Sequence, residues 1–327
     1  LATLGLTSSA DWTPVEYPPL VRRDGDALAE DIAATLARIR RHPARLSPEG
    51  ATDEGERGHM PPLFRALHMG TRLIGEASPE RLGLLMRALW RLRLVQEEGN
   101  VLRPTAKARE WLRLSDARRR RTLFLAWRDD RTWNELRLLL ATRSVMVSGE
   151  TLVQPGYPVA ARHALLELVA RQPVGQWVSL ADWVQAVKQR RPDFFRADGD
   201  YDRWEIVDTQ SGEALRGFDT WDRIEGQLAT LIVAGPLRWL GLVEVGYQEE
   251  QGPPTAFRLT PEGALLLQDE GETLNQGEEA ARPTAHIDEN LIVTIPLRET
   301  LYERYQLERF AEWQKQDTQA TYRITPE

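Results

Sequence analysis

Two similar stretches of sequence decide the expected fold, RLRLVQEEGNVLRPTAKA at 91–108 and RWLGLVEVGYQEEQGPPTAFRLTPEGA at 238–264. Each runs from the end of a helix, through Leu-Val and a Glu-Glu turn, to Arg-x-Thr and the start of another helix. Short apolar runs on both sides of a glycine-containing turn predict a β-hairpin. Similarity between two parts of one chain predicts a duplicated unit. We therefore expect two modules of the same architecture.

The residues before the first hairpin predict three helices and a short strand. Apolar residues at i, i+4, i+8 and i+11 predict a helix that begins near Ala27: Leu28, Ile32, Leu36 and Ile39. The next expected elements are a strand at 44–47, a polar loop at 48–58, and helices at 61–68 and 78–91. Ser78 is a suitable N-cap, and Pro79 suits the first helical position. This order, with the hairpin at its end, is that of a winged helix.

The same order of elements returns in the second half of the chain. We expect a helix at 159–172, a strand at 176–178 and a helix at 180–190. A long insertion at 192–220 follows, and then a third helix at 221–240. That helix is expected to bend at Gly235-Pro236, because proline interrupts the helical hydrogen bonds.

The predicted organisation has six parts. They are an irregular N-terminal segment (1–26), a basic winged-helix domain (27–114), a helical connector (115–150), a second winged-helix domain (151–272, with the insertion 192–220), a linker (273–285) and a strand–helix–strand unit (286–327). The last unit combines strands at 290–295 and 320–325 with a helix at 298–313, and it is too small to bury its own apolar face. The expected fold class is α+β: mainly α with short β-hairpins.

The end of the chain resembles a known family. ENLIVTIPLRETLYERYQLERFAEW at 289–313 and TQATYRITPE at 318–327 resemble the helicase-associated family related to the N-terminal region of the XPB helicase. ARLSPEG at 44–50 and LVQEEGNVLRPTAKAREWL at 94–112 resemble the winged-helix region of its bacterial members. The resemblance implies winged helices, a nuclear-type or nucleoid-type role and contact with DNA. It does not assign an activity, because its motifs are structural and have no catalytic specificity.

The charge distribution indicates a basic module on an acidic protein. The chain carries a net charge of −7, but residues 1–150 carry +5 and residues 151–327 carry −12. Residues 60–145 alone carry +9. Such asymmetry is typical of proteins that interact with nucleic acid. Arginine makes up 39 of the 42 basic residues, which a compositional bias of the source genome would also produce.

The candidate DNA contacts are arginines of the first module. Arg87 and Arg91 share one face of the helix at 78–91, the element that would enter the major groove, and Arg81 lies nearby. A second group is the run 118–121. The candidate set is Arg81, Arg87, Arg91, Arg118, Arg119, Arg120 and Arg121. The alternative is an ordinary solvated surface, since four consecutive arginines cannot share one helical face.

The expected hairpin tips are acidic. Glu97 and Glu98 lie at the first tip, and Glu249 and Glu250 at the second. A phosphate backbone repels acidic tips. The second module is therefore a poor DNA binder on electrostatic grounds, and it is better suited to contact with a protein.

Eleven tryptophans are many for a chain of this length. Five of them fall on apolar helical stripes and are expected in the core: Trp90, Trp111, Trp127, Trp183 and Trp239. The sequence pattern does not place Trp12, Trp204 or Trp221. A tryptophan that stacks on nucleic-acid bases would have to lie outside such stripes.

The motifs of several enzyme classes are absent from the sequence. It has no cysteine, no GxxxxGK(S/T) phosphate loop, no GxSxG elbow, and no histidine pair at HxxxH or HExxH spacing. Asp198, Asp200 and Asp202 have calcium-loop spacing, but Arg203 and Thr209 stand where an EF-hand needs Gly and Glu. We therefore expect no catalytic residue, no bound metal and no cofactor.

The sequence leads to one main hypothesis and one alternative. The main hypothesis is a non-enzymatic DNA-binding or helicase-associated protein that contacts phosphates through its basic first module. The alternative is a protein-interaction scaffold in a DNA-processing complex, with residues 151–272 binding a protein partner. A hydrolase or nucleotide enzyme is the least favoured class. With no signal peptide and no apolar run long enough to span a bilayer, we expect a cytoplasmic protein without a membrane partner.

Overall fold

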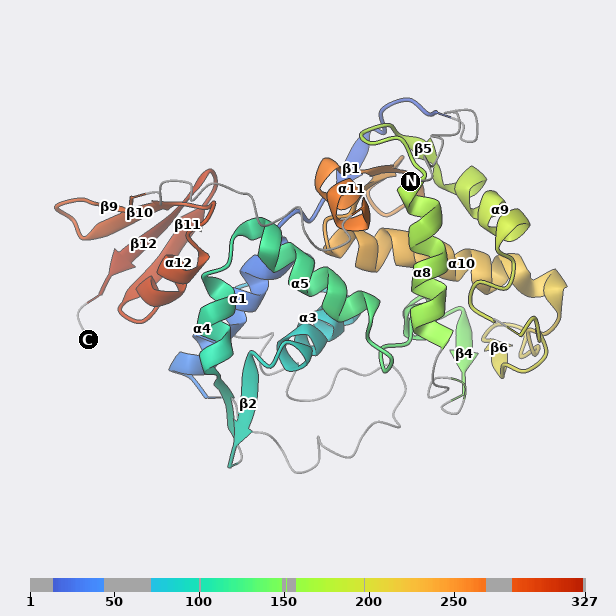
Figure 1. The fold of residues 1–327 in the computed structure, drawn as a ribbon, viewed down its shortest axis with the longest axis horizontal. Coiled ribbons are helices and arrows are strands. Elements are labelled where there is room, and N and C mark those ends of the chain that lie inside the picture. The colour runs from blue at the N-terminus through green and yellow to red at the C-terminus, as the bar shows by residue number, and fades with distance from the viewer. Residues whose placement is uncertain are drawn as a thin grey trace, which may run out of the picture. The chain divides into compact units, whose positions relative to one another are not determined.

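The computed structural model describes residues 14–43, 72–99, 101–148, 151, 157–196, 198–268 and 284–325. The fold is of the expected α+β class, with helices and small antiparallel sheets (Figure 1). The chain divides into two compact units: unit 1, residues 1–25 and 128–268, and unit 2, residues 26–127 and 269–327. This grouping is coarser than the six predicted parts and does not test their boundaries. The expected strand at 44–47, the loop at 48–58 and the helix at 61–68 lie outside the described residues.

The helical part of unit 2 is built around one deeply buried helix. Its elements are α1 (Ala27–Arg41), α3 (Pro79–Arg91), the hairpin strands β2 (Val95–Glu98) and β3 (Val101–Pro104), α4 (Ala106–Leu112) and α5 (Asp116–Arg128, in unit 2 through Trp127). The four apolar residues that predicted α1 are all at least 98% buried. α1 contacts α3, β3 and α12 (Leu301–Leu307). The expected helices at 27 and 78 and the first hairpin are therefore confirmed.

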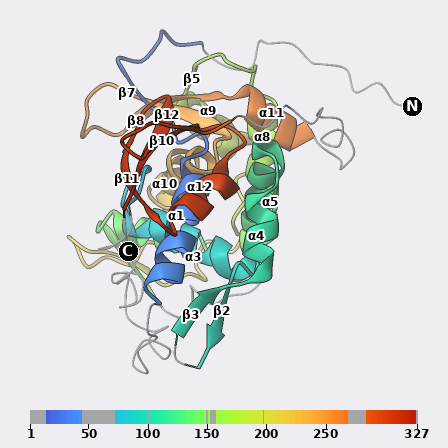
Figure 2. The ribbon, with the colours of Figure 1, turned by 90° about the vertical axis from the view of Figure 1, so that its left-hand side faces the viewer.

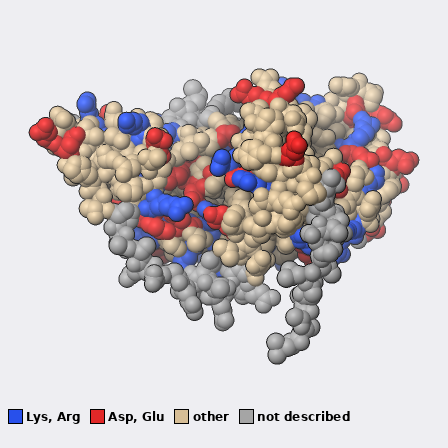
Figure 3. Space-filling model, turned by 90° about the horizontal axis from the view of Figure 1, so that it is seen from above, with Lys and Arg blue, Asp and Glu red and all other residues tan. Residues whose placement is uncertain are grey.

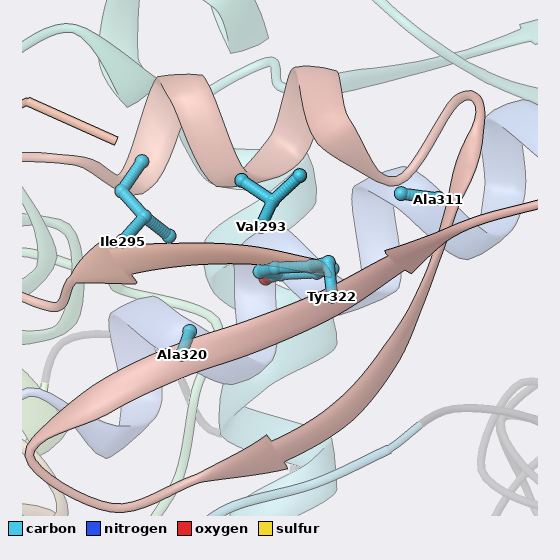
Figure 4. Packing of buried hydrophobic residues seen from close by; sticks show 5 residues of the cluster. All are labelled: Val293, Ile295, Ala311, Ala320 and Tyr322. Atoms are coloured by element: carbon cyan, nitrogen blue, oxygen red, sulfur yellow. The ribbon is translucent and has the colours of Figure 1, made fainter. Parts of the chain in front are cut away.

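The C-terminal part of unit 2 is a four-stranded antiparallel sheet covered by one helix. Its strands are β9 (His286–Ile287), β10 (Ile292–Pro296), β11 (Ala311–Gln316) and β12 (Gln319–Ile324), in the order β11-β12-β10-β9. The buried side chains face α12 in Figure 4: Val293, Ile295, Ala311, Ala320 and Tyr322. The helix expected at 298–313 was wrong in its extent, because α12 ends at Leu307 and β11 begins at Ala311. Pairing with β12 overrides the helical preference of AEWQKQ.

Arginines of the helical part stack on tyrosines of α12. The guanidinium of Arg40 lies 3.8 Å from the ring centre of Tyr305, and that of Arg113 lies 4.0 Å from the ring centre of Tyr302. The Arg304 guanidinium pairs with the Glu30 carboxylate of α1. The sheet thus obtains from the helices the packing that it cannot supply alone.

Unit 1 contains a second four-stranded antiparallel sheet, in the order β1-β7-β8-β5. Its strands are β1 (Leu20–Arg22), β5 (Val178–Ser179), β7 (Val243–Tyr247) and β8 (Pro254–Leu259). Its helices are α6 (Leu136–Ala141), α8 (Tyr157–Ala170), α9 (Leu180–Arg190), η2 (Phe218–Arg223), α10 (Glu225–Ile232), η3 (Val233–Leu237) and α11 (Pro261–Gln268). The second hairpin, β7–β8, is confirmed.

The third helix expected at 221–240 is divided into pieces of different geometry. It opens with the 3₁₀ turn η2, continues as α10 and passes into the π turn η3, which contains Pro236. The helical geometry therefore changes at Gly235-Pro236, where a bend was expected, and the bend itself stays a prediction. A π turn accommodates the proline, which cannot donate a backbone hydrogen bond.

Two strand pairings of unit 1 involve segments for which the sequence predicted no strand, including residues 145–147 of the expected helical connector. β1 lies in the segment expected to be irregular, and it pairs with β7, so that expectation was wrong for residues 20–22. A Cβ atom on Gly246 of β7 would lie 2.2 Å from Pro18 Cγ, so only glycine fits there. β6 (Ile206–Asp208), within the insertion, pairs with β4 (Val145–Val147).

Candidate nucleic-acid interface

The sequence around Ser78 fixes where α3 begins. The Ser78 hydroxyl accepts a hydrogen bond from the backbone N–H of Arg81, and Pro79 occupies the first helical position. Six apolar residues of α3 lie on one buried side of the helix, called here the buried arc: Leu82, Leu84, Leu85, Met86, Ala88 and Leu89. Residues 83, 87, 90 and 91 lie outside this arc and are partly or fully exposed.

Trp90 belongs to this exposed face and not to the core. Its side chain is 40% exposed, whereas Trp111 of α4 is 5% exposed. The expectation that Trp90 packs in the core was therefore wrong, because the six apolar residues already fill the buried arc. Trp111, Trp127, Trp183 and Trp239 are buried as expected. Trp204 and Trp221, which the sequence pattern did not place, are buried too. Trp12 lies outside the described residues.

Arg87 and Arg91 lie on the same face as Trp90. Arg91 is exposed, and Arg87 is half-buried. Residues three and four positions apart are neighbours on a helix surface, so Arg87 adjoins both Trp90 and Arg91. We call residues 83, 87, 90 and 91 the α3 face. It combines two guanidinium groups with one exposed indole ring.

Arg81 does not join the α3 face, although the sequence placed it among the candidate contacts. Its side chain is fully buried, and its guanidinium lies 2.6 Å from the carboxylate of Asp31, itself buried in α1. The same carboxylate accepts hydrogen bonds from the backbone N–H groups of Ile74 and Gly75 at 2.5 and 3.1 Å. Arg81 therefore connects α3 to α1 and cannot reach a phosphate in this structure.

The arginine run at the start of α5 separates into different environments. Arg118 is exposed, while Arg119 is buried and donates to the carbonyl oxygens of Leu112 and Leu114 and to the Asp116 carboxylate. Arg119 thus holds the junction of α4 and α5, which removes it from the set of surface contacts. Arg120 is mostly buried and forms an ion pair with Asp26 at 2.7 Å.

Arg121 is half-buried, so the run presents Arg118 most fully to solvent. The four side chains do not share one face, as the spacing predicted. Whether Arg87, Arg91, Arg118 and Arg121 contact DNA stays a prediction.

The hairpin that follows α3 carries little positive charge at its tip. Figure 2 shows β2 and β3 projecting beyond the helices of unit 2. Glu97 and Glu98 are exposed there, and Glu98 pairs with Arg103 of β3 at 2.7 Å. Because acidic groups repel phosphates, the α3 face is a better candidate interface than the hairpin tip.

Charges of opposite sign are interspersed on the surface in view in Figure 3. Such a surface attracts nucleic acid only weakly through its average charge.

The buried ion pairs of unit 1 have structural roles. Arg162 lies between Glu135, at 2.7 Å, and the carbonyl oxygen of Asp130, at 2.6 Å. Arg196 of the insertion lies 2.6 Å from the carboxylate of Glu225 at the start of α10. Burial raises the pKa of Glu225 to about 7, although Arg196 opposes the shift.

The described residues give no support for a metal site or a membrane-spanning helix. Among them there is no group of three or more His, Asp or Glu side chains that could hold a metal ion. None of their helices combines the length and apolar character needed to cross a membrane.

Comparison with known proteins adds no relative. No family model matches this chain, and no curated protein matches it significantly. The resemblance to the helicase-associated family therefore stays a prediction.

Proposed function

We propose that this chain is a non-enzymatic DNA-binding protein of the helicase-associated type, built from two winged helices. In this proposal the α3 face contacts the phosphate backbone with little preference for sequence. Arg118 and Arg121 of α5 provide further contacts. The observation that carries the proposal is the pair Arg87 and Arg91 on the outer face of the helix that precedes the hairpin.

The topology of unit 1 supports the winged-helix part of the proposal. Helices α8, α9 and α10 and strands β5, β7 and β8 follow one another as helix, strand, helix, helix and hairpin. The first strand pairs with the last, which gives the order β7-β8-β5. A winged helix closes its small sheet in this way. β1 adds a fourth strand beside β7.

In unit 2 the order of α1, α3, β2 and β3 agrees with a winged helix as far as the described residues extend. The helix before the hairpin corresponds to the recognition helix of helix-turn-helix proteins, which presents its outer face to DNA. Apolar residues cover the inner face of α3, which leaves the α3 face available for that role.

The direct test is fluorescence anisotropy with labelled duplex DNA at low salt. We expect the double variant R87A/R91A to bind about ten-fold more weakly than the unaltered chain, because charge-assisted contacts to two phosphates are lost. R171A/R216A is the matched control, since Arg171 and Arg216 are exposed arginines of unit 1 and their loss removes the same two charges. Equal loss in both variants would mean that general charge, and not the α3 face, governs binding.

A protein-interaction role for residues 151–272 is the second candidate. It is favoured by the exposed Glu249 and Glu250 at the turn between β7 and β8. In this case the chain would show no affinity for any DNA form. Reversing both charges in E249K/E250K would then abolish binding to a basic partner.

A further inference from the structure

The exposure of Trp90 is not explained by packing. The other helical tryptophans that the sequence singled out are at most 5% exposed, but Trp90 is 40% exposed. Exposing a large aromatic surface to water is unfavourable. The ring also stands on the outer face of α3, beside two arginines.

The neighbours of Trp90 favour a flat, negatively charged ligand. Side chains on a helix lean toward its N-terminus, so the indole of Trp90 is expected to lean toward the turn that contains Arg87. Within α3 itself, the acidic residue Glu80 lies in the first turn, and Arg91 lies in the last turn beside Trp90.

We propose that Trp90 stacks on an unpaired base, while Arg87 and Arg91 contact phosphates of the same strand. The ligand class is single-stranded DNA, either free or as the unpaired arm of a fork. This inference rests on the proposed function, and it names the DNA form that the α3 face prefers.

The form of the DNA follows from which part of a base the ring can reach. In duplex DNA the flat faces of the bases are covered by their stacked neighbours, and a helix in a groove meets only their edges. An unpaired base offers its π-face, and every base has one, so stacking tolerates any sequence. A protein partner would also cover an aromatic ring, but two arginines on the same face as the ring complement the phosphates of a nucleic-acid strand.

The experiment compares the full chain with W90A, W90F and R91A on two DNA probes. The probes are oligothymidine of about 12 nucleotides, which is within the site size of single-strand binders, and a blunt duplex of the same length. W313A is the matched control, because Trp313 is an exposed tryptophan of β11 in the same unit. Circular dichroism melting checks that each variant folds.

We expect W90A to bind oligothymidine about ten-fold more weakly, because base–aromatic stacking is lost. Its affinity for the duplex should stay within about two-fold of the unaltered chain, and W90F should retain most of the single-strand affinity because phenylalanine also stacks. R91A should weaken binding to both probes. Oligothymidine should quench the fluorescence of the unaltered chain, and W90F should lose that quenching.

The binding results distinguish a failure of base stacking by Trp90 from a failure of DNA binding by the whole chain. If W90A binds oligothymidine as tightly as the unaltered chain while R91A weakens both probes, the stacking role is wrong and the phosphate contacts stand. Equal weakening of both probes by W90A would also overturn it, because the ring would then not distinguish unpaired bases. If the unaltered chain binds neither probe at low salt, the proposed function fails, and the inference fails with it.

Discussion

Glu225 makes the stability of unit 1 depend on pH. Burial raises the pKa of its carboxyl group from 4.5 to about 7, even though Arg196 lies beside it. The folded form therefore holds the proton over a range in which the unfolded chain has already released it. The free energy of unfolding of unit 1 must then fall as the pH rises from about 4.5 to about 7.

The size of the effect follows from the shift in pKa. Each pKa unit corresponds to about 1.4 kcal/mol, so the shift at Glu225 corresponds to a loss of about 3 kcal/mol across that interval. The variant E225Q has a neutral side chain of the same shape, and it lacks this contribution. We expect its free energy of unfolding, relative to that of the unaltered chain, to rise by about 3 kcal/mol between pH 4.5 and pH 8.

Urea unfolding at a series of pH values measures this difference. Tryptophan fluorescence follows the transition, because Trp204 and Trp221 are buried in the same unit. E205Q is the matched control, since it removes one negative charge from an exposed site of the insertion. Parallel stability curves for E225Q and the unaltered chain would refute the reasoning, because they would show that Glu225 has the same affinity for protons in both states.

Two further predictions concern buried arginines. In G75A the new Cβ would lie 2.1 Å from the Arg81 guanidinium, so the ion pair with Asp31 must open. We expect the free energy of unfolding of unit 2 to fall by about 3–5 kcal/mol in a urea titration, and a loss below about 1 kcal/mol would show that the segment simply shifts. Replacing Arg162 by Ala should destabilise unit 1 by a similar amount, because Glu135 is left buried without its partner. The double variant R162M/E135M should regain most of that loss, and failure to regain it would mean that the carbonyl contacts of Arg162 dominate.

The parts of the fold that depend on residues close together in the sequence could be predicted from the sequence. The two hairpins and the start of α3 at Ser78 depend on turn and capping residues within a few positions. The pairings of β1 with β7 and of β4 with β6 could not be predicted, because strands of three residues carry little pattern and their partners are distant in sequence. Residues 311–313 were expected at the end of a helix, but they form the start of β11 through pairing with β12.

The candidate site was predicted only in part, for a related reason. The shared face of Arg87 and Arg91 follows from helical spacing alone. Burial of a charged side chain depends instead on a partner, and for Arg81 that partner is Asp31, on another helix. The exposure of Trp90 was missed because the pattern does not show that other residues already fill the buried arc of α3. A stripe with more apolar residues than one face can hold is the signal that would have found it.

The salt dependence of DNA binding tests the central claim most directly. The logarithm of the observed binding constant falls linearly with the logarithm of salt concentration, by about 0.7–0.9 for each phosphate contact. The account predicts salt-sensitive binding by the unaltered chain and a slope that is smaller by about 1.5 in R87A/R91A, since two contacts are removed. An unchanged slope in this variant, or the absence of binding to every DNA form at low salt, would contradict it.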